Sequence, residues 1–274
     1  MFFKEGEMLE LIYDLYARLF AKKFFNKWNK FIFLLSLRGL GILNYKSYKQ
    51  SGEANFAISH LSKVKKGIIF DVGANVGNYS KSLIEVNQNV DIFCFEPHPS
   101  TFQKLLSNVN HLGIKSFNVG VGSSNGTLNL YDYAGNDGSS HASLYKEVIE
   151  EIHKGQAVEH EVKIITLTAF ANEHKIERVL LLKIDTEGHE LEVLKGFEPY
   201  IRQNKVDLIH FEFNEMNVAS RVFFKDFWEF LPNYDFYRML QDGLIPIKNY
   251  NPVYCEIFAY QNIVAKLKVE YKHN

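Results

Sequence analysis

The stretch FDVGANVGNYS, residues 70–80, decides the fold because it joins two kinds of hydrophobic pattern. The short apolar run Gly67–Val72 predicts a buried strand, and residues 77–87 show the spacing of a helix. Between them, Gly73 and Gly77 permit the positive φ angles of a tight turn. A strand, a glycine turn and a helix in this order predict the first unit of a parallel sheet.

The same alternation continues along the chain. Further strands are expected at Val90–Phe95, Ile114–Val121, Val179–Ile184, Val206–Phe213, Phe236–Leu240 and Cys255–Tyr260. Further helices are expected over residues 99–111, 189–204 and 222–231. Strands that alternate with helices of this length predict an α/β fold, with a mostly parallel sheet and helices on both faces.

Composition and charge exclude several classes of protein. The 274 residues carry 31 Lys and Arg against 32 Asp and Glu, a net charge of −1, which argues against a globally basic nucleic-acid binder. Two cysteines exclude a disulfide scaffold, and a hydrophobic content of 46% excludes a disordered chain. We therefore expect a folded protein without a nucleic-acid partner.

The first 50 residues form a distinct, basic piece. They carry nine Lys or Arg and four Asp or Glu, a net charge of +5, which leaves −6 for the other 224 residues. Apolar residues at helical spacing predict helices over 7–20 and 24–37. One interpretation is a helical cap packed on the core. The other is a basic amphipathic pair that rests peripherally on a membrane surface or holds a partner chain.

No segment of this region is expected to span a membrane. Its longest apolar run, Phe31–Leu35, is far shorter than the roughly 20 residues that a spanning helix needs. Early acidic residues and a late apolar stretch do not match a secretory signal. The expected compartment is therefore the cytoplasm.

One stretch breaks the alternation of strands and helices. Thr127–Tyr133 and Val162–Leu167 are strand-like. Between them lie residues 134–141, which are polar and rich in glycine and serine, and then the charged segment 145–160. A loop of this length inside a compact domain is usually functional, so residues 134–160 are interpreted as a lid-like insertion. His141 and Ser143 in this loop are candidate substrate contacts, although a solvated histidine is the simpler reading of His141.

Two carboxylates follow the first two strands. Asp71 would repel a pyrophosphate but would attract a sulfonium group, and Asn75 departs from the dinucleotide pattern G-x-G-x-x-G. Glu96 lies at the tip of the second strand, where a carboxylate can accept both hydroxyls of a ribose. Together they favour S-adenosylmethionine over a nicotinamide dinucleotide. The alternative is a pair of turn-capping carboxylates in an unrelated α/β protein.

A second acidic cluster follows the fourth and fifth long strands. The candidate catalytic residues are Asp185, Glu187, His189 and Glu212. Such groups can remove a proton from a hydroxyl, or carboxylates can hold a divalent metal that lowers the pKa of that hydroxyl. Three alternatives stay open: Glu187 stabilises a helix start, His189 only packs, and Glu212 pairs with Lys183.

These motifs resemble the FkbM-like family of S-adenosylmethionine-dependent methyltransferases. The matching segments are FDVGANVGNYS (70–80), FEPHPSTFQKLLSNV (95–109), GVGSSNGTLNLY (120–131), ITLTAF (165–170) and LLKIDTEGHELEVLKG (181–196). The resemblance extends over about residues 52–264 and is specific only in combination. It implies the seven-stranded, Rossmann-like class I methyltransferase sheet. It also implies an O-methyltransferase of natural products or glycans, since most members of the family have that activity.

The resemblance also implies roles for individual residues. Those that would hold the methionine half of the cofactor are Asp71, Gly73, Ala74, Asn75 and Gly77. Glu96, followed by Pro97, would hold the ribose, and Ser123 or its neighbour Ser124 would approach the adenine. The chain departs from the family at Thr168, where the family commonly has Asp.

The sequence therefore predicts a basic helical extension over residues 1–50 and a methyltransferase domain over residues 51–274. The expected reaction is O-methylation of a hydroxyl on a sugar, a glycan or a glycosylated metabolite. The alternatives are an N- or carboxyl-methyltransferase and a non-catalytic nucleotide-binding module of the same fold. Neither metal dependence nor oligomeric state follows from the sequence.

Overall fold

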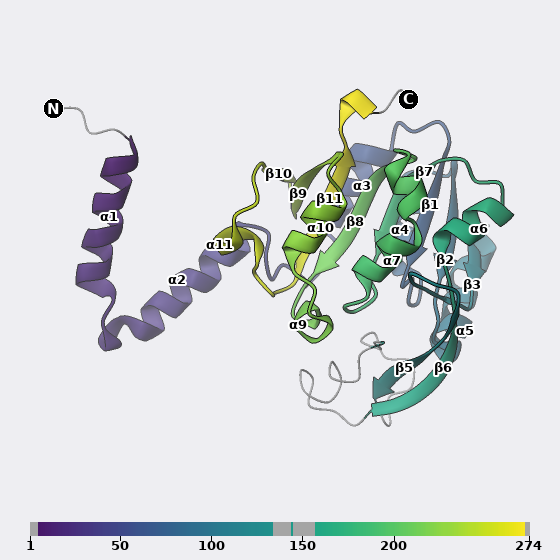
Figure 1. The fold of residues 1–274 in the computed structure, drawn as a ribbon, viewed down its shortest axis with the longest axis horizontal. Coiled ribbons are helices and arrows are strands. Elements are labelled where there is room, and N and C mark those ends of the chain that lie inside the picture. The colour runs from purple at the N-terminus through teal and green to yellow at the C-terminus, as the bar shows by residue number, and fades with distance from the viewer. Residues whose placement is uncertain (1–4, 134–143, 145–156, 272–274) are drawn as a thin grey trace.

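A central sheet of eight strands organises the computed structural model, which describes residues 5–133, 144 and 157–271 (Figure 1). Its strands, in sheet order, are β10 (Gly243–Ile247), β9 (Tyr234–Leu240), β11 (Gln261–Leu267), β8 (Val206–Phe213), β7 (Val179–Ile184), β1 (Gly67–Val72), β2 (Val90–Phe95) and β3 (Lys115–Phe117).

The sheet is mostly parallel, as predicted. Strands β3, β2, β1, β7 and β8 pair in parallel, whereas β11 pairs antiparallel with both β8 and β9. Strand β10 pairs antiparallel with β9 and adds an eighth strand to the seven that were expected.

Helices cover both faces of the sheet, because neighbouring side chains along each strand point to opposite faces. Ile69 of β1 packs in the core with α3, α4 and α5, and Phe70 packs in the core with α6, α7, α8 and α10. The helices of the body are α3 (Glu53–Leu61), α4 (Asn78–Val86), α5 (Pro99–Val109), α6 (Leu167–Glu173), α7 (Glu190–Gly196), α8 (Glu198–Arg202), α9 (Met216–Ser220), α10 (Phe224–Phe230) and α11 (Pro252–Cys255). The 3₁₀ turns in the body are η2 (Asn110–Leu112) and η4 (Val269–Tyr271).

A second, three-stranded sheet has the order β4 (Gly120–Val121), β6 (Ala157–Ile165) and β5 (Gly126–Tyr133). It corrects two predictions. The expected strand over 114–121 splits between the two sheets as β3 and β4. The expected strand over 162–167 ends at Ile165, because the side chain of Thr166 accepts a hydrogen bond from the backbone N–H of Ala169 and begins α6.

Two more predicted elements are wrong in their limits. The long helix over 189–204 divides into α7 and α8 at Phe197, where Pro199 enters the first turn of the second helix. Residues 255–260 do not form a strand, since Asn251 caps the short helix α11 and the strand begins only at Gln261. Helices α3, α6, α9 and α11 and strand β10 were not predicted.

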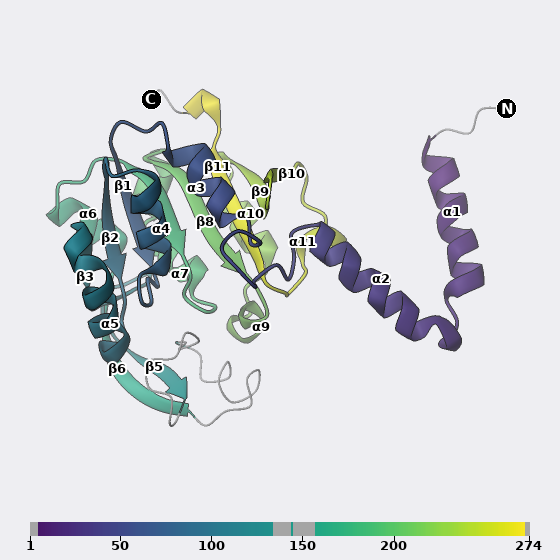
Figure 2. The same cartoon turned by 180° about the vertical axis from the view of Figure 1, so that it is seen from behind.

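The predicted N-terminal helices are confirmed as α1 (Glu5–Phe20) and α2 (Asn26–Gly39), joined by the 3₁₀ turn η1 (Lys23–Phe25). They do not form a cap on the core. The described side chains of α1 are exposed as far as Leu19, and α1 stands apart from the sheet in both views (Figures 1 and 2). Within the described part of the chain, no helix is long and apolar enough to cross a membrane.

Candidate active site

Three of the predicted site residues, Asp71, Glu96 and Asp185, lie at the neighbouring ends of β1, β2 and β7. The chain leaves β1 toward β2 on one side and later returns to β7 on the other, so this edge is a switch point of the sheet. Ligands of open α/β sheets bind at such a point, outside the carboxyl ends of the strands.

The loop after β1 lies directly against its neighbours because of Gly73. This residue has φ +73°, and a Cβ placed on it would lie 1.7 Å from the carbonyl oxygen of Asp185. Its backbone N–H donates to the carbonyl of Phe95 at 3.0 Å. Only glycine lets the backbone approach both flanking strands in this way.

Glu96 closes the other side of the loop. Its Oε2 accepts from the backbone N–H of Asn75 at 2.9 Å, and its Oε1 accepts from the backbone N–H of His98 at 2.9 Å. Burial raises the pKa of Glu96 to about 7, although both hydrogen bonds favour the carboxylate. Each carboxylate oxygen keeps a lone pair for a further donor.

The structure places Asp71 beneath this loop rather than at its mouth. Its side chain is fully buried, with Oδ2 accepting from the hydroxyl of Ser80 at 2.6 Å and Oδ1 lying 3.7 Å from Lys183 Nζ. Asp71 and Lys183 are register partners in β1 and β7. Asp71 therefore lies behind Lys183 and lines neither of the two pockets described below.

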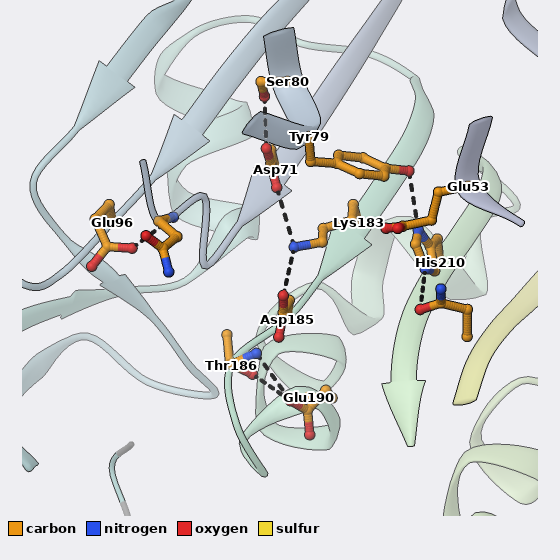
Figure 3. Close-up of polar contacts among 12 residues, drawn as sticks. Glu53, Asp71, Tyr79, Ser80, Glu96, Lys183, Asp185, Thr186, Glu190 and His210 are labelled. Atoms are coloured by element: carbon orange, nitrogen blue, oxygen red, sulfur yellow. Dashed lines mark hydrogen bonds and ion pairs between the residues drawn. The ribbon is translucent and has the colours of Figure 1, made fainter. Parts of the chain in front are cut away.

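Lys183 of β7 lies between Asp71 and Asp185 and forms an ion pair with each, as Figure 3 shows. It is 5% exposed, and its Nζ lies 3.1 Å from Asp185 Oδ2 and 5.3 Å from the ring centre of Tyr79. Burial would lower the pKa of Lys183, but the charges of Asp185 and Asp71 outweigh it and raise that pKa. Lys183 is therefore a permanent cation that fixes the Asp185 carboxylate.

The loop after β7 is shaped by Glu190. Its Oε1 accepts from the backbone N–H of Thr186 at 3.0 Å, the Thr186 hydroxyl at 3.1 Å and the backbone N–H of Gly188 at 3.1 Å. These bonds hold Glu187 at φ +52° and Gly188 at φ +104°. Glu190 thus has a structural role in presenting Glu187.

Two pockets meet at this edge. The β2-side pocket is lined by Val72, Gly73, Asn75, Phe95, Glu96, Pro97, Thr101, Gly120, Val121, Leu130, Leu144, Ile164, Asp185, Thr186, Glu187 and His189. The α3-side pocket is lined by Tyr45, Ser47, Tyr48, Ser51, Glu53, Gly73, Ala74, Asn75, Val76, Asn78, Tyr79, Ser82, Lys183, Asp185, Glu212 and Tyr260. Gly73, Asn75 and Asp185 line both pockets, so the two meet across these residues.

The β2-side pocket has the chemistry that adenosine requires. Val121, Leu130 and Ile164 form apolar walls that would suit a purine, and the Glu96 carboxylate is an acceptor that would suit ribose hydroxyls. His189 adds a neutral ring to this pocket, because burial lowers its pKa to about 4. A group with that pKa has too low an affinity for a proton to be an efficient general base at neutral pH.

The α3-side pocket combines aromatic rings with acidic groups. Glu53 and Glu212 line it beside Asp185. Burial raises the pKa of Glu212 well above its ordinary value, and the charges of Asp185 and Glu187 raise it further. In the described part of the chain, no group of three His, Cys, Asp or Glu side chains is arranged to hold a metal ion.

The structure separates the remaining predicted residues. Gly77 lines neither pocket, and its missing side chain lets α4 approach Leu105 and Val109 of α5. Ser123 is exposed and lines neither pocket, and Gly120 and Val121 occupy that side instead. The candidates His141 and Ser143 lie outside the described residues.

Sequence reasoning missed most of the α3-side pocket. Glu53, Tyr45 and Tyr48 precede the recognised motifs, and Tyr260 falls in a wrongly predicted strand. No local pattern marks these residues, since only the folded sheet brings them together. Thr168, where the chain departs from the family pattern, donates to the carbonyl of Gly196 at 2.7 Å and fastens α6 to the end of α7.

The pocket at the switch point, which combines apolar walls with the Glu96 carboxylate, meets a second pocket across Asp185. The chain belongs to the FkbM methyltransferase family, since the family model "Methyltransferase FkbM domain" matches residues 71–237, more than half of its length.

Three relatives illustrate the family. The chain is 33% identical over 155 residues to methyltransferase sdnD of Sordaria araneosa, covering 47% of this chain and 60% of the relative. It is 27% identical to the hexuronic acid methyltransferase AglP of Haloferax volcanii, covering 47% and 49%. It is 20% identical to the 2-O-methyltransferase NoeI of Sinorhizobium fredii, covering 65% and 76%. The matches thus span about half to three quarters of these relatives.

Solved structures that the chain is similar to include a TehB-like S-adenosylmethionine-dependent methyltransferase from Corynebacterium glutamicum. It is 13% identical with a TM-score of 0.42, covering 89% of this chain and 100% of that one. A precorrin-6y C5,15-methyltransferase from Geobacter metallireducens is 9% identical with a TM-score of 0.41, covering 83% and 94%.

Proposed function

We propose that this protein is an O-methyltransferase that acts on a hydroxyl group of a sugar, in a glycan or a glycosylated metabolite. The observation that carries the proposal is that Asp185 lines both pockets. In methyl transfer, the acceptor must meet the methyl donor in line. The wall shared by the two pockets is therefore the place for the transfer, with a carboxylate at hand for the hydroxyl proton.

The lining of the α3-side pocket supports a sugar acceptor. Tyr45, Tyr48 and Tyr260 provide ring faces, while serine hydroxyls and carboxylates provide hydrogen-bonding partners for several hydroxyl groups. The names of two relatives agree with this chemistry, since one is a hexuronic acid methyltransferase and the other a 2-O-methyltransferase. S-adenosylmethionine supplies the methyl group when bound.

The proposal also divides the chain at residue 50. Residues 51–274 would form the methyltransferase domain and residues 1–50 the extension, although Tyr45 and Tyr48 of the extension reach the α3-side pocket.

Mass spectrometry of saccharides incubated with the protein and methyl-labelled S-adenosylmethionine tests the reaction. We expect one labelled methyl group on a hydroxyl, as an ether that survives mild alkali. A methyl ester, which alkali removes, or a methylamine would instead support the carboxyl- or N-methyltransferase alternative. Absence of S-adenosylhomocysteine release with every acceptor in the panel would support the non-catalytic binding module.

The cofactor half of the proposal predicts a role for Glu96. Glu96→Gln should weaken S-adenosylmethionine binding by about 1.5–3 kcal/mol, the scale of hydrogen bonds to a charged group. Because the pKa of Glu96 is about 7, the wild-type carboxylate takes up a proton as the pH falls from ~8 to ~6, so affinity should fall with pH. The variant should lose this dependence.

Isothermal titration at several pH values makes the measurement. Glu173→Gln is the matched control, since it makes the same chemical change on an exposed residue of α6 that lines neither pocket. Wild-type affinity in a folded Glu96→Gln variant would remove Glu96 from the cofactor site.

A further inference from the structure

An arm of two helices, α1 and α2, extends from the body of the molecule (Figures 1 and 2). The arm is attached at the far end of α2. Leu37 and Ile42 are buried there, and the backbone N–H of Leu43 donates to the carbonyl of Tyr260 at 2.8 Å. Because Tyr260 lines the α3-side pocket, the arm is attached beside that pocket.

The corner between the two helices has a defined shape. The hydroxyl of Tyr16 donates to Asn29 Oδ1 at 2.7 Å, and Asn29 Nδ2 donates to the carbonyl of Phe20 at 3.0 Å. The rings of Phe20 and Phe25 meet edge to face with centres 5.1 Å apart. These contacts fix how the arm presents its outer side chains.

Large apolar side chains of the arm face water. Phe24 is 88% exposed, and Trp28, Phe31 and Leu35 are each 51–53% exposed. The last three are spaced by three and four residues along α2, so they share one face of the helix. Apolar groups gathered on a surface in this way mark an interaction site.

The residues that flank this face in the sequence carry charge of one sign. Between Asp14 and Glu53 the chain has eight Lys or Arg and no acidic residue. Lys22, Lys23 and Lys27 are exposed beside the aromatic face. Aromatic side chains flanked by lysines match the boundary between the acyl chains and the headgroups of an anionic bilayer, where rings insert and ammonium groups remain at the phosphates.

We propose that the segment Lys22–Leu35 binds peripherally to the surface of an anionic lipid bilayer. The charge complementarity selects this occupant, and the exposed rings need an apolar medium that a nucleic-acid backbone does not offer. The attachment beside the α3-side pocket brings this pocket near the bound surface. The proposed membrane binding does not depend on which acceptor the protein methylates.

Vesicle sedimentation and tryptophan fluorescence test the proposal on the full chain. The protein has two tryptophans, so Trp228→Phe leaves Trp28 as the only reporter. We expect this variant to sediment with vesicles of phosphatidylglycerol and phosphatidylcholine but not with phosphatidylcholine alone. The Trp28 emission should shift to shorter wavelength on binding, and added salt should release the protein from the vesicles.

Matched charge reversals separate the arm from general electrostatics. Reversal of Lys22, Lys23, Lys27 and Lys30 to Glu should weaken partitioning by more than about a hundredfold. Reversal of four exposed lysines of the body, Lys63, Lys65, Lys66 and Lys104, makes the same change in net charge and should have a much smaller effect. Trp28→Ser with Phe31→Ser should also abolish binding.

Three results would overturn the proposal. The first is equal binding to neutral and anionic vesicles, and the second is equal loss in both lysine variants. The third is a dimer in light scattering without lipid that dissociates in the Trp28→Ser, Phe31→Ser variant. That result would show that a second copy of the chain covers the face. Saccharide methylation in solution is measured separately, so it reports on the proposed function alone.

Discussion

Replacing Asp185 with asparagine should lower the rate of methyl transfer by roughly 10²–10⁴ while leaving S-adenosylmethionine affinity nearly unchanged, the usual contribution of general acid–base catalysis. Asp185 is the only carboxylate that lines both pockets among the described residues. The variant keeps the shape of the side chain and removes its charge. Lys183 then retains Asp71 as its partner, so the fold should survive the change.

The separation of kcat from cofactor affinity makes this prediction specific. Asp235→Asn is the control, because it makes the same change at an exposed position on β9. A chelator added to the wild-type enzyme separates two mechanisms: loss of activity that magnesium restores indicates a metal held by carboxylates, and indifference indicates a direct base. If Asp185→Asn is fully active while Glu212→Gln or His189→Ala is inactive, the base is one of those residues.

The local part of the site was predictable from the sequence. The apolar run Gly67–Val72, the glycines after it and Glu96 at the next strand end form a continuous pattern whose meaning depends only on neighbouring residues. Parallel strands place their carboxyl ends at one edge of the sheet, and the structure places both Glu96 and Asp185 around the β2-side pocket at that edge.

The non-local part was not predictable. Whether Asp71 faces a ligand or the core depends on Lys183, which follows it by more than one hundred residues and reaches it only through the pairing of β1 with β7. In the same way, Tyr48 and Tyr260 come from opposite ends of the chain to line one pocket. Side-chain periodicity within a segment contains no information about such contacts.

The predicted ends of some helices and strands were wrong for a related reason. Residues 189–204 have continuous helical periodicity, but Phe197 is fully buried and the chain turns there into α8. The interpretation of the arm as a cap assumed that apolar faces always find the core. The exposed face of α2 shows that periodicity identifies an apolar face without identifying what covers it.

The largest effect on stability is expected from Lys183→Met. Lys183 is 5% exposed and Asp71 is fully buried, so the substitution leaves a carboxylate in the core without its cation. Removal of one partner of a buried ion pair costs about 3–5 kcal/mol of the free energy of unfolding. Denaturant unfolding should show this loss, and the Asp71→Asn, Lys183→Met double variant should recover a large part of it.

The pH dependence of the single variant provides an independent check. Burial already raises the pKa of Asp71, and the Lys183 charge lowers it. Loss of that charge in Lys183→Met therefore raises the pKa of Asp71 further. A carboxyl whose pKa is higher in the folded state favours folding below its unfolded pKa, and this contribution is lost as the pH rises through the folded pKa. The deficit of Lys183→Met relative to wild type should therefore shrink as the pH is lowered. A deficit that is the same at every pH, and that Asp71→Asn does not relieve, would mean that Lys183 stabilises the fold by packing on Tyr79 rather than by neutralising Asp71.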